Sequence, residues 1–314
     1  MSLVIEEKKV LDDWEVLMRE YLQDIRGVKD KEQLESILTQ FRTNLQEEER
    51  IAFCGYLDGA PCGFISGSAR GEIIEAISLY VLPKSYDQNT ASELVKTLTA
   101  KAFETGFQHF RLQMRLPFNK EPNFEEILKK DGYLIFQRAS MNLEVKDVLD
   151  YSYTLPEGYT FEPFSINKVD EIMQVLVDAN PIGHTDTHIY PEMRSAEITK
   201  QVFGGATENF TKLDPAINPQ IIFESKIVGI SQVFTSQKDV AFIGEMCIHP
   251  DHQRKGLGKA LMKNIILESS RRDIKRIRLA VTVSNVGAYK LYEKTGFKKA
   301  SDNIAVIKHK YPYL

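Results

Sequence analysis

Two glycines, Gly256 and Gly258, stand where an apolar, strand-like run of residues gives way to a helical pattern. A glycine lacks a Cβ, so the backbone at these positions can come close to a ligand. The free N–H groups at the start of a helix can hold phosphate oxygens. Tight packing of the helix against a neighbour would explain the same two glycines, so the pair alone does not decide between the two interpretations.

Positive charge gathers around this glycine pair. Residues 251–278 contain nine lysines or arginines and three acidic residues, a surplus of six positive charges. The surplus suits a polyanionic cofactor, although a solvated helix face or a nucleic-acid surface would also be basic. No aromatic residue interrupts the basic run, so we do not expect nucleic acid as a partner.

A second stretch with a distinctive spacing follows the strand-like run 278–283. It places six residues at fixed intervals, namely Asn285, Ala288, Leu291, Tyr292, Gly296 and Phe297. Together with the loop that holds Gln253, Gly256 and Gly258, this stretch resembles the GNAT superfamily of N-acyltransferases. Both motifs stand in the order and the strand–loop–helix context of that family, and the resemblance implies acetyl-CoA as the acyl donor.

The resemblance also implies a role for each part of the two stretches. The backbone of Met246, Cys247 and Ile248 would bind the pantetheine where the central strand splays from its neighbour. The pyrophosphate would lie on the loop and helix start that follow, formed by Gln253, Arg254, Lys255, Gly256, Leu257, Gly258 and Lys259. Asn285 would contact the cofactor arm, and Tyr292 would lie beside the thioester sulfur.

Acyl transfer to an amine sets requirements that Tyr292 and Glu245 could meet. The acceptor ammonium must lose a proton before it attacks the thioester, and the coenzyme A thiolate leaves last. Tyr292 can donate a hydrogen bond to that thiolate; full proton transfer is uphill, because the ordinary pKa values are about 10 for tyrosine and about 8.5 for a thiol. Glu245 is the only carboxylate on its strand and is our candidate for the general base. Alternatively, Tyr292 is a core aromatic residue, and Glu245 faces a neighbouring strand or solvent.

We predict that the segment 180–191 is a loop. It contains three polar residues at alternate positions, namely His184, Asp186 and His188. The resemblance implies that this region shapes the acceptor site. An i, i+2, i+4 spacing could hold a metal on an extended segment, but the sequence offers no further cluster of ligands. We therefore expect no metal here and favour substrate contact or plain loop polarity.

The elements that position these residues are predicted twice along the chain. In the second half, hydrophobic spacing predicts strands over 240–248 and 276–283 and helices over 256–271 and 286–294. A shift of 167 residues places earlier residues on matching later ones, namely Pro83 on Pro250, Leu94 on Leu261 and Arg111 on Arg278. The regular offset favours an internal duplication.

We therefore predict an α/β (α+β) protein of two tandem GNAT-like domains, each with a mixed, mostly antiparallel central sheet flanked by helices. A polar stretch with Pro156 and Gly158 sets the predicted boundary, which gives domains 1–150 and 151–314. No element is predicted before residue 12. Tandem GNAT proteins such as mycothiol synthase have a similar plan, but their acceptor does not transfer to this chain.

The first half departs from the motif at each chemical position. The residues that replace Gln253, Gly256, Gly258 and Tyr292 are Tyr86, Asn89, Ala91 and Leu128. Asn89 and Ala91 therefore place side chains at two positions where the second half has glycines without a side chain. We predict that the first domain is a degenerate, non-catalytic copy, with an empty or blocked cofactor groove, that supports the second domain or forms part of its acceptor cleft.

Composition argues against several other classes of protein. The 314 residues include 40 lysines and arginines and 44 acidic residues, which gives a net charge of −4. Three cysteines without a Cys-x-x-Cys pair argue against a secreted disulfide scaffold and a thiolate zinc site, and fit a reducing cytosol. The apolar runs are too short for a membrane span, and the N-terminus lacks a signal-peptide pattern. We expect a cytoplasmic protein with no membrane partner.

Two functions from different classes fit the sequence. The first is an acetyl-CoA-dependent N-acetyltransferase that transfers an acetyl group to a primary amine of a small molecule or peptide by direct attack on the thioester. The second is a non-catalytic acyl-CoA-binding regulator with the same fold. The intact Asn285 and Tyr292 favour the enzyme, because binding alone needs no group at the sulfur. The sequence leaves the acceptor, the acyl group and the oligomeric state open, a homodimer included.

Overall fold

The structure, a computed structural model, describes residues 2–47, 50–115, 121–148, 150–204, 213–237 and 239–311. The chain forms two compact units. The first unit comprises Met1–Phe136 and Ile304–Tyr313, and the second comprises Gln137–Asn303. The boundary predicted from the sequence lies after residue 150. Both junctions instead fall inside strands, β6 (Leu134–Glu144) and β12 (Lys298–His309), where no polar or glycine-rich linker marks them in the sequence.

The second unit is built on a mixed sheet. Its strands lie side by side in the order β7-β8-β9-β10-β11-β6. Parallel pairing joins β10 to β11, and the other neighbours are antiparallel. Besides β6, the strands are β7 (Tyr159–Glu162), β8 (Gln220–Phe223), β9 (Lys226–Gln237), β10 (Val240–Ile248) and β11 (Arg276–Thr282).

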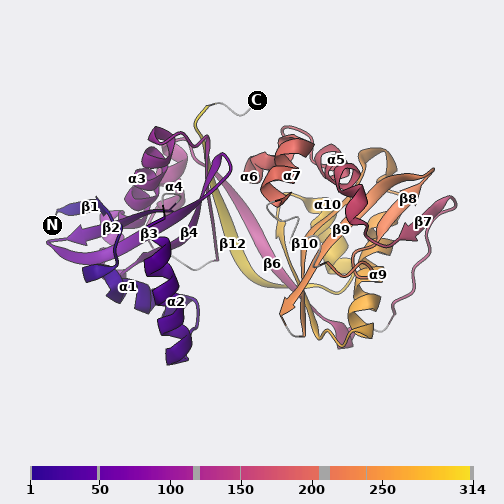
Figure 1. The fold of residues 1–314 in the computed structure, drawn as a ribbon, viewed down its shortest axis with the longest axis horizontal. Helices are drawn as coiled ribbons and strands as arrows, with labels where there is room; N and C mark the ends of the chain where they lie inside the picture. Colours follow the sequence, from indigo (N-terminus) through magenta and orange to yellow (C-terminus); the bar gives the residue numbers. More distant parts are fainter. Residues whose placement is uncertain are drawn as a thin grey trace. The chain divides into compact units, whose positions relative to one another are not determined.

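Helices cover both faces of this sheet (Figure 1). Side chains of β9 pack on both faces of the sheet, and a register shift against β8 between Ile221 and Ile222 breaks the strict alternation of the strand. Val228 and Val233 pack in the core that contains α9, whereas Ile227 and Ile230 pack in the core that contains α5. The helices are α5 (Val169–Ala179), α6 (Thr185–Ile189), α7 (Ala196–Gly204), α9 (Leu257–Arg271) and α10 (Val286–Lys294), with single helical turns at Val145–Asp147, Ile166–Lys168, Pro191–Arg194 and Pro250–His252.

The first unit repeats this plan. Its strands lie in the order β1-β2-β3-β4-β5, with β4 and β5 parallel and the others antiparallel. On β2, Ile51 and Phe53 face α3, while Ala52, Cys54 and Tyr56 face α1 and α2. The elements are β1 (Leu3–Glu7), β2 (Arg50–Leu57), β3 (Ala60–Arg70), β4 (Ile73–Val81), β5 (His109–Arg115), α1 (Glu15–Glu20), α2 (Lys31–Asn44), α3 (Thr90–Glu104) and α4 (Phe124–Lys130), with short turns at Asp12–Trp14, Tyr21–Ile25 and Pro83–Gln88.

The parallel strand pairs show the duplication residue by residue. In the first unit this pairing begins at Ile73–His109 and ends at Ala76–Leu112. In the second unit it runs from Val240–Arg276 to Ile243–Leu279, at the same offset of 167 residues. Each unit thus contains a mixed, mostly antiparallel sheet flanked by helices, which confirms the predicted fold class. Among the described residues, no helix combines the length and the apolar character that a membrane crossing needs.

Candidate active site

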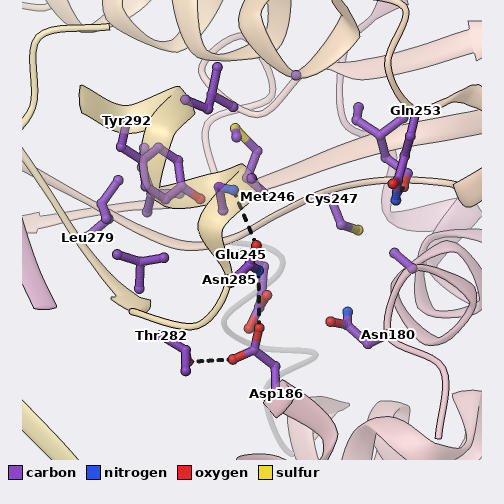
Figure 2. Close-up of a pocket in the computed structure, with 18 of the residues that line it drawn as sticks. Asn180, Asp186, Glu245, Met246, Cys247, Gln253, Leu279, Thr282, Asn285 and Tyr292 are labelled. Carbon is purple, nitrogen blue, oxygen red and sulfur yellow. Dashed lines mark hydrogen bonds between the residues drawn. The ribbon is translucent and has the colours of Figure 1, made fainter. Parts of the chain in front are cut away.

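A cavity of about 720 Å³ lies in the second unit where β10 separates from β11. Within the described residues, pairing between these strands stops at Ile243 and Leu279, while β10 continues to Ile248 along β9. The start of α9, one side of α10 and the segment around α6 complete the wall. Figure 2 shows Tyr292 and Asp186 on opposite sides of this cavity, with residues of β10 between them.

Met246, Cys247 and Ile248 line the cavity beyond the point of separation. Backbone N–H and C=O groups of a strand point to both of its edges, and β9 occupies only one edge of this segment. The other edge can therefore bind the amide groups of an extended ligand. Burial raises the pKa of the Cys247 thiol well above its ordinary value, and the neighbouring Glu245 adds to the effect. Cys247 thus offers its backbone here rather than a thiolate nucleophile.

The start of α9 forms one end of the cavity. Gly256 is the N-cap residue and has a φ of +84°, a conformation that a side chain would strain. Gly256 has no side chain to cap the helix, and no described side chain accepts from its first turn, so these N–H groups are available to a ligand. At Gly258 a Cβ would approach Leu291 to 3.4 Å, which leaves little room for a larger residue. Gln253 also lines the cavity, and its amide donates a hydrogen bond to the carbonyl of Ile248.

Positive side chains line this same end of the cavity. Arg254 and Lys259 come from the predicted loop, and Lys290 and Lys294 come from α10. Lys255 was predicted to join them, but it is absent from the cavity wall. Its ammonium group donates hydrogen bonds to the Tyr159 hydroxyl at 3.2 Å and to the carbonyl of Asp251 at 3.1 Å.

Tyr292 reaches the middle of the cavity from α10 and is only 8% exposed. Its ring also packs against Phe297, with ring centroids 5.9 Å apart. Burial raises the pKa of the Tyr292 hydroxyl far above the usual range, and the charge of Glu245 adds to this. Tyr292 therefore keeps its proton at neutral pH and can donate a hydrogen bond into the cavity.

Glu245 enters the cavity from β10, just before the splayed segment. Burial, with a further contribution from the charge of Asp186, raises its pKa to about 8; Arg138 lowers the pKa and Glu192 raises it by smaller amounts. A carboxyl group with this pKa can accept a proton from an ammonium group near neutral pH.

The acceptor segment differs from the predicted loop. Residues Thr185–Ile189 form the short helix α6, with His184 as its N-cap. His184 and Asp186 line the cavity, whereas His188 does not. Burial lowers the pKa of His188. Within the described part of the chain, no group of three or more His, Cys, Asp or Glu side chains could hold a metal ion.

Asp186 connects α6 to the end of β11 and the start of α10 (Figure 2). Its carboxylate accepts hydrogen bonds from the Thr282 hydroxyl at 2.6 Å and from the Asn285 amide at 3.4 Å. Asn285 in turn accepts a hydrogen bond from the backbone N–H of Ala288 and so caps α10. Asn285 therefore links α6 to the start of α10.

The sequence profile of the Acetyltransferase (GNAT) family matches residues 13–121 and 170–297, which is most of the chain. The chain belongs to the GNAT acetyltransferase family. The two matches fall in the two halves of the sequence, so the protein has two GNAT domains. The splayed strand, the glycine-containing helix start and Tyr292 all lie in the region of the second match.

Curated relatives match a shorter part of this GNAT protein. The ribosomal protein bS18-alanine N-acetyltransferase of Escherichia coli is 40% identical over 63 residues, which are 20% of this chain and 43% of the relative. Glucosamine 6-phosphate N-acetyltransferase of Schizosaccharomyces pombe is 31% identical over 80 residues, 24% of this chain and 69% of the relative. The chain thus spans less than half the length of the first of these relatives.

Solved structures share the fold over nearly the whole chain. A GCN5-related N-acetyltransferase from Sphaerobacter thermophilus has a TM-score of 0.66 and 14% identity, and covers 99% of this chain and 97% of its own. A tandem GNAT protein from the clavulanic acid biosynthesis pathway has a TM-score of 0.58 and 12% identity, with 99% of both chains covered. At such low identity the likeness shows the fold alone.

The first GNAT domain carries a different arrangement at the equivalent helix start. Asn89 keeps the left-handed backbone of Gly256, with a φ of 54°. The carboxylate of Glu121, which is 6% exposed, accepts hydrogen bonds from the backbone N–H of Ala91 at 2.6 Å and of Ser92 at 3.2 Å, and another from the Ser92 hydroxyl. An internal acidic side chain thus takes the donors that α9 leaves available. Leu128, at the position of Tyr292, is fully buried in the core.

Several residues of the cavity wall were missed by sequence analysis, namely Arg138, Asn180, Tyr190, Met193, Lys290 and Lys294. Arg138 lies on β6, which the predicted boundary assigned to the first domain, and its guanidinium donates a 2.5 Å hydrogen bond to Tyr190. Lys290 and Lys294 are four residues apart, so they share a helix face. That spacing was a signal available in the sequence.

Proposed function

We propose that the second GNAT domain is an acetyl-CoA-dependent N-acetyltransferase that acts on a primary amine of a small molecule or peptide. One observation carries the proposal. An uncapped helix start, a half-paired strand, a protonated tyrosine and a carboxyl group with a pKa of about 8 line one cavity. A binding protein would need the first two features but not the last two.

The wall of the cavity fits acetyl-CoA in chemical terms. The pyrophosphate would accept hydrogen bonds from the first-turn N–H groups of α9, from Gly256 to Lys259, with Arg254 nearby as a counter-ion. The amide groups of the pantetheine would pair with the open edge of β10 at Met246–Ile248. The four cations at this end suit a ligand with several phosphate charges.

Glu245 would serve as the general base. The acceptor arrives as an ammonium ion, and the ionised carboxyl group of Glu245 takes one of its protons. The nitrogen lone pair then forms a bond to the thioester carbonyl carbon, the carbon–sulfur bond breaks, and the second proton of the nitrogen passes to the sulfur, which leaves as the thiol. Because the pKa of Glu245 lies near 8, it holds the proton more firmly than an ordinary carboxylate would.

Tyr292 would assist the leaving group. Its hydroxyl is protonated and buried, so it can donate a hydrogen bond to the sulfur as negative charge develops there. This interaction is strongest after the carbon–sulfur bond has begun to break, so it acts on the rate more than on binding. A backbone N–H near Cys247 would stabilise the charge on the carbonyl oxygen.

We propose that the first GNAT domain binds no acetyl-CoA. The Glu121 carboxylate already takes the helix-start donors that a pyrophosphate would need, and its charge would repel a phosphate. The domain would then serve to support the second one. The names of the curated relatives describe acetyl transfer to an alanine of a ribosomal protein and to glucosamine 6-phosphate. Both are amines, which supports the proposed class of acceptor.

The function is tested by thiol release from acetyl-CoA in the presence of a library of primary amines. The proposal predicts that at least one amine raises thiol release well above the amine-free rate in the wild-type chain, and that the Glu245→Gln variant loses this increase. Binding of acetyl-CoA without release in any mixture would favour the acyl-CoA-binding regulator.

A further inference from the structure

Asp186 holds a carboxylate in a fixed place at the acceptor end of the cavity. Two donors from neighbouring elements, Thr282 on β11 and Asn285 at the start of α10, bind its oxygens. The side chain is still 20% exposed and contributes to the cavity wall. Each carboxylate oxygen can accept further hydrogen bonds, so the group can also contact a ligand.

Within the part of the chain that the structure describes, no lysine or arginine contacts the carboxylate of Asp186. Among the described residues, the basic side chain in contact with it is that of His184, whose Nδ1 lies 3.7 Å from the carboxylate and accepts a hydrogen bond from the backbone N–H of Asp186. The four cations of the cavity wall belong to the cofactor end, on α9 and α10 and the loop before them. The remaining cation of the wall, Arg138, bonds to Tyr190 and acts on Glu245.

Proton transfer to Glu245 leaves this charge in place. The groups that face Glu245 are Asp186, Glu192 and Arg138, together with Tyr292 and Cys247, which burial keeps neutral. When Glu245 has taken the proton of the reacting amine, that amine and Glu245 are both neutral. Asp186 still carries its negative charge beside them, in a cavity where charge is costly to leave unpaired.

We propose that Asp186 binds a second, non-reacting cationic group of the acceptor, so that the preferred substrates are diamines or other amines that carry a further positive charge. This inference rests on the proposed function and narrows its acceptor class. Asp186 is then a specificity-determining residue, while Glu245 serves the nitrogen that reacts.

Two probes of nearly equal shape test the inference. The second ammonium group of 1,4-diaminobutane is replaced by a methyl group in 1-aminopentane. The kcat/KM of the full chain is measured for both amines with acetyl-CoA, in the wild type and in Asp186→Asn, which keeps the shape of the side chain and one acceptor oxygen. Asp170→Asn is the control, because Asp170 is a surface carboxylate that pairs with Lys200 and has an 81% exposed side chain.

We expect the wild type and the control to favour the diamine by about tenfold, the effect of one charge-assisted hydrogen bond. In Asp186→Asn the ratio should fall towards one. A purely structural role of Asp186 would lower both rates and leave the ratio unchanged, and that result would overturn the inference. Equal rates for both amines in the wild type would also overturn it. Transfer to no amine at all would instead contradict the proposed function.

Discussion

The carboxylate of Asp186 accepts a 2.6 Å hydrogen bond from the hydroxyl of Thr282, which joins the short helix α6 to the end of β11. A helix of five residues has little stability of its own. Its position therefore depends on tertiary contacts of this kind, and so does the shape of the acceptor end of the cavity.

Thr282→Val should weaken acceptor binding. The substitution removes the hydroxyl donor and keeps the branched shape, so Asp186 loses a charge-assisted hydrogen bond. We expect the KM for the acceptor to rise about tenfold and the KM for acetyl-CoA to change little. Steady-state kinetics with each substrate varied in turn would measure this. Ser284→Ala, which removes a longer 3.3 Å contact to Thr185, is the matched control and should have a much smaller effect.

Gly256→Glu should weaken acetyl-CoA binding by more than tenfold, because it adds a negative charge at the helix start that would hold the pyrophosphate. Calorimetric titration of the full chain would measure the affinity and the number of sites, which we expect to be one per chain. Gly256→Ala separates the two causes, since it adds only the strain of a Cβ at a φ of +84°. Equal losses in both variants would assign the effect to strain.

Tyr292→Phe should lower kcat by about one to two orders of magnitude while the dissociation constant of acetyl-CoA changes by less than threefold. The lost hydroxyl acts on the departing sulfur, so its absence appears in the rate. Single-turnover kinetics would separate chemistry from product release. A variant with the wild-type rate would assign Tyr292 to packing against Phe297 alone.

Glu245 should set the pH dependence of the reaction. The base acts in its ionised form and has a pKa of about 8, so the rate should rise with pH through that value. Glu245→Gln should abolish this rise.

Glu245 should also make the stability of the protein depend on pH. In the folded state Glu245 holds its proton more tightly than in the unfolded chain, where glutamates titrate near 4.5. The free energy of unfolding should therefore fall as the pH rises from about 4.5 to about 8, and it should fall less in Glu245→Gln.

Glu121→Ala should destabilise the first domain by about 3 kcal/mol, because it leaves the donors of Ala91 and Ser92 buried without their acceptor. Glu121→Gln keeps an acceptor oxygen and should cost less. Urea denaturation of the full chain would measure both, with the exposed Glu126→Ala on α4 as the control. If Glu121→Ala were as stable as the control, the helix start of α3 would not need an internal anion.

Periodicity and motif spacing predicted most of the fold, and the motif residues Met246, Gly256 and Tyr292 line one cavity. The predicted ranges of β10 and α10 match the structure, because long apolar patterns and a capping asparagine mark their ends. Strand β1 was missed, since only alternate side chains of this short edge strand are partly buried. The helix α6 was missed because five polar-rich residues carry no helical period, and its hydrogen bonds come from residues about 100 positions away.

The acceptor side and the unit boundaries depend on contacts that no local pattern encodes. Arg138 enters the cavity because β6 pairs with β11, a strand more than 130 residues later in the sequence. Lys255 has the same local sequence signal as Arg254, yet a tertiary hydrogen bond to Tyr159 turns it away from the cavity. The assignment of individual site residues therefore stays a prediction until the variants above are measured.

The central claim is that an amine takes the acetyl group of acetyl-CoA in the second domain. The most direct measurement is mass spectrometry of 1,4-diaminobutane after incubation with acetyl-CoA and the full chain, with released thiol measured in parallel. We predict N-acetylated product and thiol in equal amounts for the wild type, and at least a tenfold slower formation of both for Tyr292→Phe. Thiol release without acetylated amine, or acetylated amine formed as fast by a Gly256→Glu and Tyr292→Phe double variant, would contradict the claim.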